Sequence, residues 1–451
     1  MGFGAYAHGY NCKATGVLSS AFGYETQADG LGAFVTGREN KGGFAALVGG
    51  YQNTAFGGAA SATGLQTNAN GYASHTEGRQ TNANGFASHA EGDNTTSEAS
   101  TAHAEGTNTT AKGYASHAEG NSTNKYDVNT HGETADVIEQ SWRDLGPLER
   151  FSLALGSVSH VEGNDNLALG ISSHAEGEKT VAKGAKAHAE GNYARAYGEN
   201  AHAEGYDTEA RGYTAHAEGN GTIADALASH AEGVYANAAG PGSHAEGYGT
   251  SAYAEYSHVE GKNTVANEVN AHAEGNNTKA SGISSHAEGR NTEARGADSH
   301  AEGYQTLASG DQAHTEGENT TASAWATHAE GYLTQATAKY AHAEGNGARA
   351  EGLASHAEGS STKAEGENAH AEGNNTIATG AGSHAEGLLA KAEGVYSHAE
   401  GSSEAYGSYS HAEGQNSSAK GYASHAEGYD TESKGFGSHA EGRGTIASSD
   451  A

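Results

Sequence analysis

The histidines of this chain recur at a fixed interval. The sequence has 27 His in 451 residues, and 25 of them stand in one short motif, such as Ser88-His89-Ala90-Glu91-Gly92. Successive motif histidines are 14 residues apart, except for a gap of 29 between His131 and His160 and a step of 13 to His411. Five degenerate coils before His75 keep the same step through their glycines. Such self-similarity is typical of a repeat architecture.

A second pattern, T-x-A-x-G, fills the other half of each repeat, as in Thr278-Lys279-Ala280-Ser281-Gly282. Both halves alternate with period two, which is typical of β-strands. Two five-residue strands and two short turns make up one rung of a parallel β-roll or β-solenoid. Helical repeats need longer units and tolerate glycine poorly. We therefore predict an all-β solenoid of about 31 rungs with a rise of about 4.8 Å each, which gives an elongated fibre on the order of 150 Å long.

The interior of this solenoid is predicted to be narrow. The chain has 68 Gly but only 8 Phe, 2 Trp and 1 Met, so a large conventional core is excluded. The x positions of T-x-A-x-G carry residues such as Lys279, Glu293 and Arg295, which a dry core would not accept. We therefore expect Thr, Ala and Gly of that half to point inward. By the same logic Ser, Ala and Gly of the motif point inward, while His and Glu point outward.

The His/Glu face hardly varies along the array, whereas the x positions of the other strand do. A solvated strand has no reason to be so uniform, so we expect a periodic partner, most simply another copy of the chain. Two alternatives stay open: a solvated charged face, and a column that binds metal or anions. No individual metal site is assigned. The candidate inter-chain seam consists of His75, Glu77, His89, Glu91, His103, Glu105, His117, Glu119, His160, Glu162, His174, Glu176, His188, Glu190, His202, Glu204, His216, Glu218, His230, Glu232, His244, Glu246, His258, Glu260, His272, Glu274, His286, Glu288, His300, Glu302, His314, Glu316, His328, Glu330, His342, Glu344, His356, Glu358, His370, Glu372, His384, Glu386, His398, Glu400, His411, Glu413, His425, Glu427, His439 and Glu441.

The net charge favours pairing between the two columns. It is −32 with His neutral, and stacked glutamates about 4.8 Å apart repel one another. If imidazolium and carboxylate pair, the pKa of His is expected to be raised and that of Glu lowered. Stability is then expected to be greatest in mildly acidic solution and to decline toward alkaline pH.

The repeat SHAEGxxTxAxGxx resembles the 14-residue repeat of the YadA-like heads of trimeric autotransporter adhesins, SVAIGxxSxAxG, over residues 1–131 and 152–451. This resemblance implies a left-handed parallel β-roll and a homotrimer with three chains side by side. The family's Val and Ile correspond to His and Glu here, whereas Tyr6, Phe22, Phe34 and Leu47 match the apolar version. The repeat is also similar to those of fibre or tail-spike proteins of phages that infect Gram-positive bacteria.

One stretch interrupts the array, so we expect three parts: an N-terminal roll over residues 1–131, a non-repeat insertion over 132–151, and a main roll over 152–451. Thr134–Arg150 is expected to form a short helix, with Val137, Ile138, Trp142 and Leu145 close to one face and a stop at Gly146-Pro147. The helix acts as a lateral brace on the roll or as a protruding binding element.

Tyrosines in the turns are candidates for surface binding. Tyr206, Tyr248, Tyr304, Tyr332 and Tyr429 follow the motif glycine. Exposed rows of these rings would stack on sugars, whereas the alternative is packing along neighbouring rungs or at the seam.

Several function classes are disfavoured by the sequence. Catalysis needs one pocket whose groups differ from their surroundings, and 25 equivalent motifs provide none, so we expect no enzyme, no catalytic residue and no cofactor. The balance of 56 Asp and Glu against 24 Lys and Arg disfavours nucleic-acid binding. No stretch is long and apolar enough to span a membrane. We expect a structural extracellular fibre on a virion or cell surface, with itself as partner and a host-cell glycan or protein as the candidate external partner.

Overall fold

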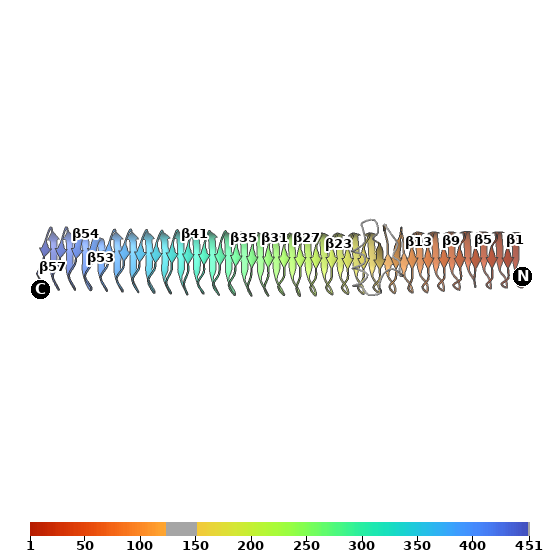
Figure 1. Cartoon of the computed structure of the whole chain (residues 1–451), viewed down its shortest axis with the longest axis horizontal. Coiled ribbons are helices and arrows are strands. Elements are labelled where there is room, and N and C mark those ends of the chain that lie inside the picture. The colour runs from red at the N-terminus through yellow and green to blue at the C-terminus, as the bar shows by residue number, and fades with distance from the viewer. Residues whose placement is uncertain (123–150, 450–451) are drawn as a thin grey trace. The chain divides into compact units, whose positions relative to one another are not determined.

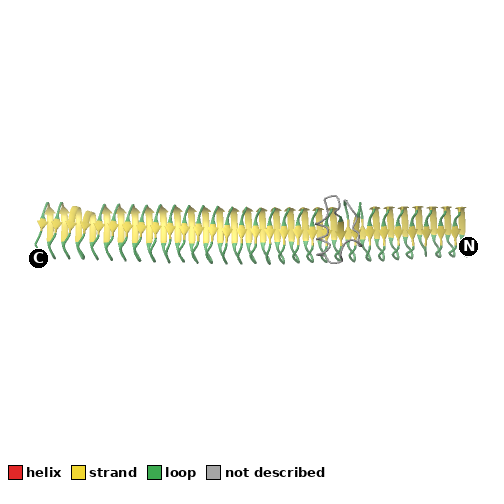
Figure 2. Ribbon diagram, viewed as in Figure 1, coloured by secondary structure: helices red, strands yellow, loops and turns green. Residues whose placement is uncertain are grey.

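The computed structural model describes residues 1–122 and 151–449, and these residues form only strands, turns and loops (Figure 2). No helix occurs among them, so the described part of the chain offers no helical segment that would cross a membrane. The structure confirms the predicted all-β class. The expected helix with Val137, Ile138, Trp142 and Leu145 lies outside the described residues, as does His131.

The chain divides into two compact units, Met1–Tyr235 and Ala236–Ala451. Each unit is a parallel β-solenoid whose strands pair with the equivalent strands one rung away (Figure 1). In the first unit, β1 (Tyr6–Tyr10) pairs with β3 (Ser20–Tyr24), and in the second, β35 (His272–Asn276) pairs with β37 (His286–Arg290). The register is fixed by the repeat, because His272 lies opposite His286 and Glu274 opposite Glu288.

Each regular rung contains one long and one short strand. The long strand begins at the motif histidine and runs for five residues, as in β35, and the short strand has two residues, as in β36 (Lys279–Ala280). The prediction of two five-residue strands was therefore wrong for the second half. The N–H of Gly282 donates to Ser285 Oγ of its own turn at 3.1 Å, so the turn already begins at this glycine.

A few rungs depart from this plan. β15 (His103–Ala104) and β17 (His117–Ala118) are cut to two residues. β53 (His398–Ala405) and β54 (His411–Ala419) run on through the turn, with a register shift between Ser402 and Glu404. This shift accommodates the 13-residue step from His398 to His411.

The core has the predicted small side chains. In one typical rung Ser285, Ala287, Thr292 and Ala294 are buried, whereas Glu293 between the last two is partly exposed. Burial of Ala and Thr on facing strands keeps the two sheets close together. The motif glycine differs from the prediction: Gly275 is half-exposed, and its φ of +114° places it in a conformation that other residues rarely adopt.

The ladder continues directly across the interruption. β16 (Thr109–Ala111) pairs with β18 (Ser152–Ala154), and β17 pairs with β19 (His160–Asn164), so His117 and His160 are neighbours. Leu153, Leu167 and Val181 occupy x positions of the second strand after the gap and are fully buried, unlike the charged residues found there in other rungs. This apolar patch was not singled out in the sequence. The role of the insertion lies outside the described residues and stays a prediction.

Candidate functional site

The motif histidines form stacked columns along one face of each unit. Their rings lie on the rings of the neighbouring rungs, with centroids 4.6 Å apart for His89–His103 and 5.0 Å apart for His300–His314. Most pairs are nearly parallel, at 2° for His328–His342. The stacking follows from the strand register, because equivalent residues of adjacent parallel strands lie about 4.8 Å apart.

A glutamate column runs beside the histidines, because Glu follows two residues later on the same side of the strand. In the rungs where the two atoms lie within 4.0 Å, the distance from His Nε2 to the Glu Oε2 of the same rung runs from 3.4 Å at His328–Glu330 to 4.0 Å at His103–Glu105. Both columns are half-exposed: the side chain of His103 is 34% and that of Glu105 44% accessible. The candidate seam residues of the described rungs thus lie together on one face, and we call this surface the His/Glu ladder.

The electrostatics of the ladder differ from the sequence expectation. Burial lowers the pKa of His103, and the neighbouring His89 and His117 lower it further, while Glu91 and Glu119 act in the opposite direction with less effect. Within the single chain the pKa of His103 is thus lowered, by burial first and then by the like charges of the stacked rings, whereas the raised pKa expected for pairing with Glu at an inter-chain seam stays a prediction. The histidines with a lowered pKa are His89, His103, His160, His174, His202, His258, His272, His286, His314, His356, His384, His398 and His425.

The lowered pKa values predict loss of stability in mild acid. The unfolded chain binds a proton at each of these histidines near pH 6.5, while burial and the neighbouring imidazoles oppose protonation in the folded ladder, so the stability that they contribute is full above about 6.5 and falls as pH decreases toward the folded pKa. Melting temperatures measured from pH 9 to pH 5 with a chelator present should be flat above pH 7.5 and decline below 6.5. A maximum between pH 5 and 6 would show instead that imidazolium–carboxylate pairs stabilise the fold.

The same face is apolar in the first coils. By register, Tyr6, Phe34 and Leu47 occupy the position taken by histidine from His75 onward, and Phe22 occupies that of glutamate. Tyr6, Phe34 and Leu47 are 56%, 45% and 51% exposed. Ring contacts join Tyr6 to Phe22 at 5.4 Å and Phe22 to Phe34 at 5.8 Å. We call these four residues the apolar strip.

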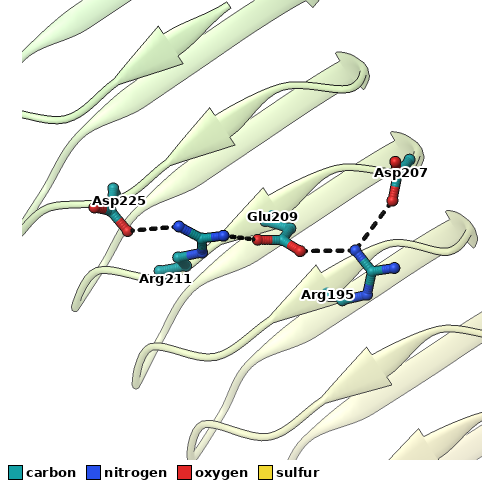
Figure 3. A network of polar contacts seen from close by, with 5 residues as sticks. All are labelled: Arg195, Asp207, Glu209, Arg211 and Asp225. Carbon is teal, nitrogen blue, oxygen red and sulfur yellow. Dashed lines mark hydrogen bonds and ion pairs between the residues drawn. The ribbon is translucent and has the colours of Figure 1, made fainter. Parts of the chain in front are cut away.

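The second sheet carries a different surface, whose charges pair locally. Arg195 Nη1 lies 2.7 Å from Glu209 Oε1 and 3.0 Å from Asp207 Oδ1, and Arg211 contacts both Glu209 and Asp225 (Figure 3). Glu209 and Arg211 belong to one rung, whereas the other pairs join neighbouring rungs, so opposite charges within and between repeats neutralise one another. Partly exposed pairs of this kind contribute little stability each. This face needs no external partner for its charges.

The five candidate tyrosines do not form a continuous row, because no two of them stand in adjacent rungs. Cations lie over several of their rings: Arg290 over Tyr304 at 4.9 Å, Arg443 over Tyr429 at 5.1 Å and Lys262 over Tyr248 at 5.9 Å. These contacts favour packing along the rungs over stacking on sugars, although sugar binding stays a prediction.

A column of exposed aromatic rings was missed in the sequence. It comprises Tyr396, Tyr409, Tyr422 and Phe436, whose centroids are 5.2–5.4 Å apart. The sequence shows this column as aromatic residues in the same turn of successive repeats.

Comparison with known proteins agrees with this geometry. Residues 14–40, 301–323 and 357–383 match the YadA head domain repeat (2 copies). No curated protein matches the chain significantly. The chain is therefore a β-solenoid repeat protein that carries YadA-type head repeats, and this combination is that of an adhesin-type structural protein.

Proposed function

We propose that the chain is the shaft of a non-enzymatic extracellular fibre, in which three copies lie side by side with the His/Glu ladder and the apolar strip at the inter-chain seam. The threefold arrangement is inferred from the likeness to YadA-type heads. The need for a partner at this face is inferred from the residues themselves.

The apolar strip carries this proposal. Phe34 and Leu47 expose about half of their surface in the single chain, although they stand in register with the histidines. Adjacent exposed apolar side chains are typical of an interaction surface. Because strip and ladder occupy the same face of the solenoid, one partner in parallel register would cover both.

The polar ladder supports the same arrangement. Nε2 of His89 and His103 is shielded from solvent and makes no hydrogen bond within the chain. Such atoms are costly unless another group pairs with them. Glutamates of a second chain would form hydrogen bonds with these Nε2 atoms. The histidines would then lie between glutamates and reduce the repulsion within each glutamate column.

The repetition favours a structural role over catalysis. In a solenoid each rung contacts only its neighbours, so stability accumulates along the stack and length is easily varied. We place the fibre on a cell or virion surface, where it mediates attachment or holds another domain at a distance. Recognition of a host glycan or protein would come from places where the repeat breaks, such as residues 134–150 or the exposed tyrosines.

Removal of whole rungs tests the shaft role. Deletion of Ala273–His314 removes three repeats and joins His272 to Thr315 in register, so the protein is expected to assemble and melt as before while becoming shorter by about 14 Å. Electron microscopy and scattering measure the length. Deletion of Ala273–Leu307 is the control, because it removes two and a half repeats. The T-x-A-x-G half of a repeat would then follow His272 in the sheet that carries the ladder, so this variant should fail to assemble. Loss of surface attachment in the in-register deletion would place recognition in those rungs and contradict a shaft.

A further inference from the structure

The His/Glu ladder brings nitrogen and oxygen ligands together at regular intervals. Nε2 of His89, a carboxylate oxygen of Glu91 and a ring nitrogen of His103 lie within 4.8 Å of one another. The same triad recurs as His103, Glu105 and His117, as His160, Glu162 and His174, as His174, Glu176 and His188, and as His370, Glu372 and His384. With two further triads, this geometry occurs seven times among the described residues.

The nitrogens of these triads have unused bonding capacity. Nε2 of His103, His174 and His384 is shielded from solvent and takes part in no hydrogen bond. The nearest carboxylate oxygen to His103 Nε2 within its rung is 4.0 Å away, which is too far for a hydrogen bond. Each triad thus holds a lone-pair atom, a carboxylate and a second imidazole around a small space.

We propose that the His/Glu ladder is a linear array of divalent transition-metal sites, in which each ion is bound by the histidine and glutamate of one rung and by the histidine of the next. Imidazole and carboxylate together suit Zn²⁺, Co²⁺, Ni²⁺ and Cu²⁺. Water completes the coordination. The inference rests on a single chain; where a second copy covers the ladder, the ion takes the place at Nε2 that a glutamate of that copy would otherwise fill.

The distances fit such an ion after small side-chain movements. Zn²⁺ with ligands at about 2.0–2.1 Å in tetrahedral geometry requires ligand atoms roughly 3.3 Å apart. The separation of His328 Nε2 and Glu330 Oε2 is already 3.4 Å. Adjacent rings must tilt to bring their nitrogens closer, and tilts of 53° at His202–His216 and 45° at His258–His272 occur within the ladder.

Sharing of histidines sets the stoichiometry. His103 belongs to two triads, but its Nε2 binds only one ion, so neighbouring triads exclude each other. A full ladder therefore holds one ion for every two rungs. The 25 motifs of the chain would bind about 12 ions, one for each pair of adjacent imidazoles.

The experiment compares two variants of the full chain that lose the same number of histidines in unit 2. In the alternate variant every second rung is changed: His258→Gln, His286→Gln, His314→Gln, His342→Gln, His370→Gln, His398→Gln and His425→Gln. In the block variant consecutive rungs are changed: His356→Gln, His370→Gln, His384→Gln, His398→Gln, His411→Gln, His425→Gln and His439→Gln. Each protein is stripped with a chelator, titrated with Zn²⁺ by calorimetry and analysed for bound metal after dialysis.

The unmodified chain is expected to bind about 12 Zn²⁺ and to melt at a higher temperature with the ion, reversibly on chelation. The alternate variant leaves no adjacent histidines in unit 2 and should lose about 7 ions, whereas the block variant keeps eight adjacent rungs and should lose only about 3. Equal losses in the two variants, or about one ion per histidine in the unmodified chain, would overturn the bridged array. If the alternate variant does not fold, the stoichiometry of the unmodified chain and its melting shift decide the question.

Discussion

Gly275→Ala is expected to disrupt the stack between two rungs, because the glycines of successive rungs approach each other closely at this position. An added Cβ would lie 2.0 Å from the carbonyl oxygen of Gly289, a backbone atom that is fixed by the ladder. The φ of +114° adds strain for any residue with a side chain. We expect a loss of about 3–5 kcal/mol, measured by denaturant unfolding, and faster hydrogen exchange in the rungs around residues 275 and 289.

Gly32→Ala is the matched control for this substitution. Gly32 has a φ of +70° and no atom within 4 Å of an added Cβ. The equivalent residue of the next rung is Ala45, which adopts a φ of 51°. The control should therefore change stability by less than about 1 kcal/mol. Equal effects of the two substitutions would mean that the close approach of successive glycines does not limit rung spacing.

Phe34→Asp combined with Leu47→Asp is expected to weaken self-association strongly while leaving the fold of the chain intact. Both side chains are already half-exposed in the single chain, so the solenoid loses little by their removal. At a seam, burial of each contributes about 1.5–3 kcal/mol, and loss of about 3 kcal/mol per chain weakens association roughly 100-fold. Sedimentation velocity measures the change and circular dichroism verifies the fold.

The control for this prediction introduces the same charges elsewhere. Phe56 and Phe86 are 61% and 56% exposed and lie outside the apolar strip. Phe56→Asp combined with Phe86→Asp should leave the assembly unchanged. Dissociation of both double variants to the same extent would indicate that added charge, rather than the strip, is responsible.

The fold was predictable because the repeat carries two kinds of information. The 14-residue interval predicts the length of one rung, and the period-two alternation predicts which side chains face the interior of the solenoid. Ala287 and Thr292 are buried as predicted, while His286 and Glu288 are half-exposed. The length of the second strand was not predictable, because it depends on the hydrogen bond between Gly282 and Ser285 within the turn. The positive φ of Gly275 was not predictable either, because a period-two alternation indicates which way side chains point and not the backbone conformation of a glycine.

The chemistry of the ladder was predictable only in part. The sequence placed His and Glu side by side, and a raised histidine pKa was expected from pairing with Glu at an inter-chain seam. The structure adds the neighbours above and below, and these imidazoles together with burial lower the pKa of residues such as His174. Similarly, the apolar strip was visible as residues, whereas its alignment with the ladder required the observed register of Leu47, Ser61 and His75.

The molar mass of the full chain in solution is the most direct test of the seam. Sedimentation equilibrium at pH 7.5, with and without a chelator, should give three times the mass of one chain at all protein concentrations where the fibre is stable. A folded monomer with the circular dichroism of a β-solenoid would contradict the account, because the apolar strip and the ladder would then be solvated surfaces.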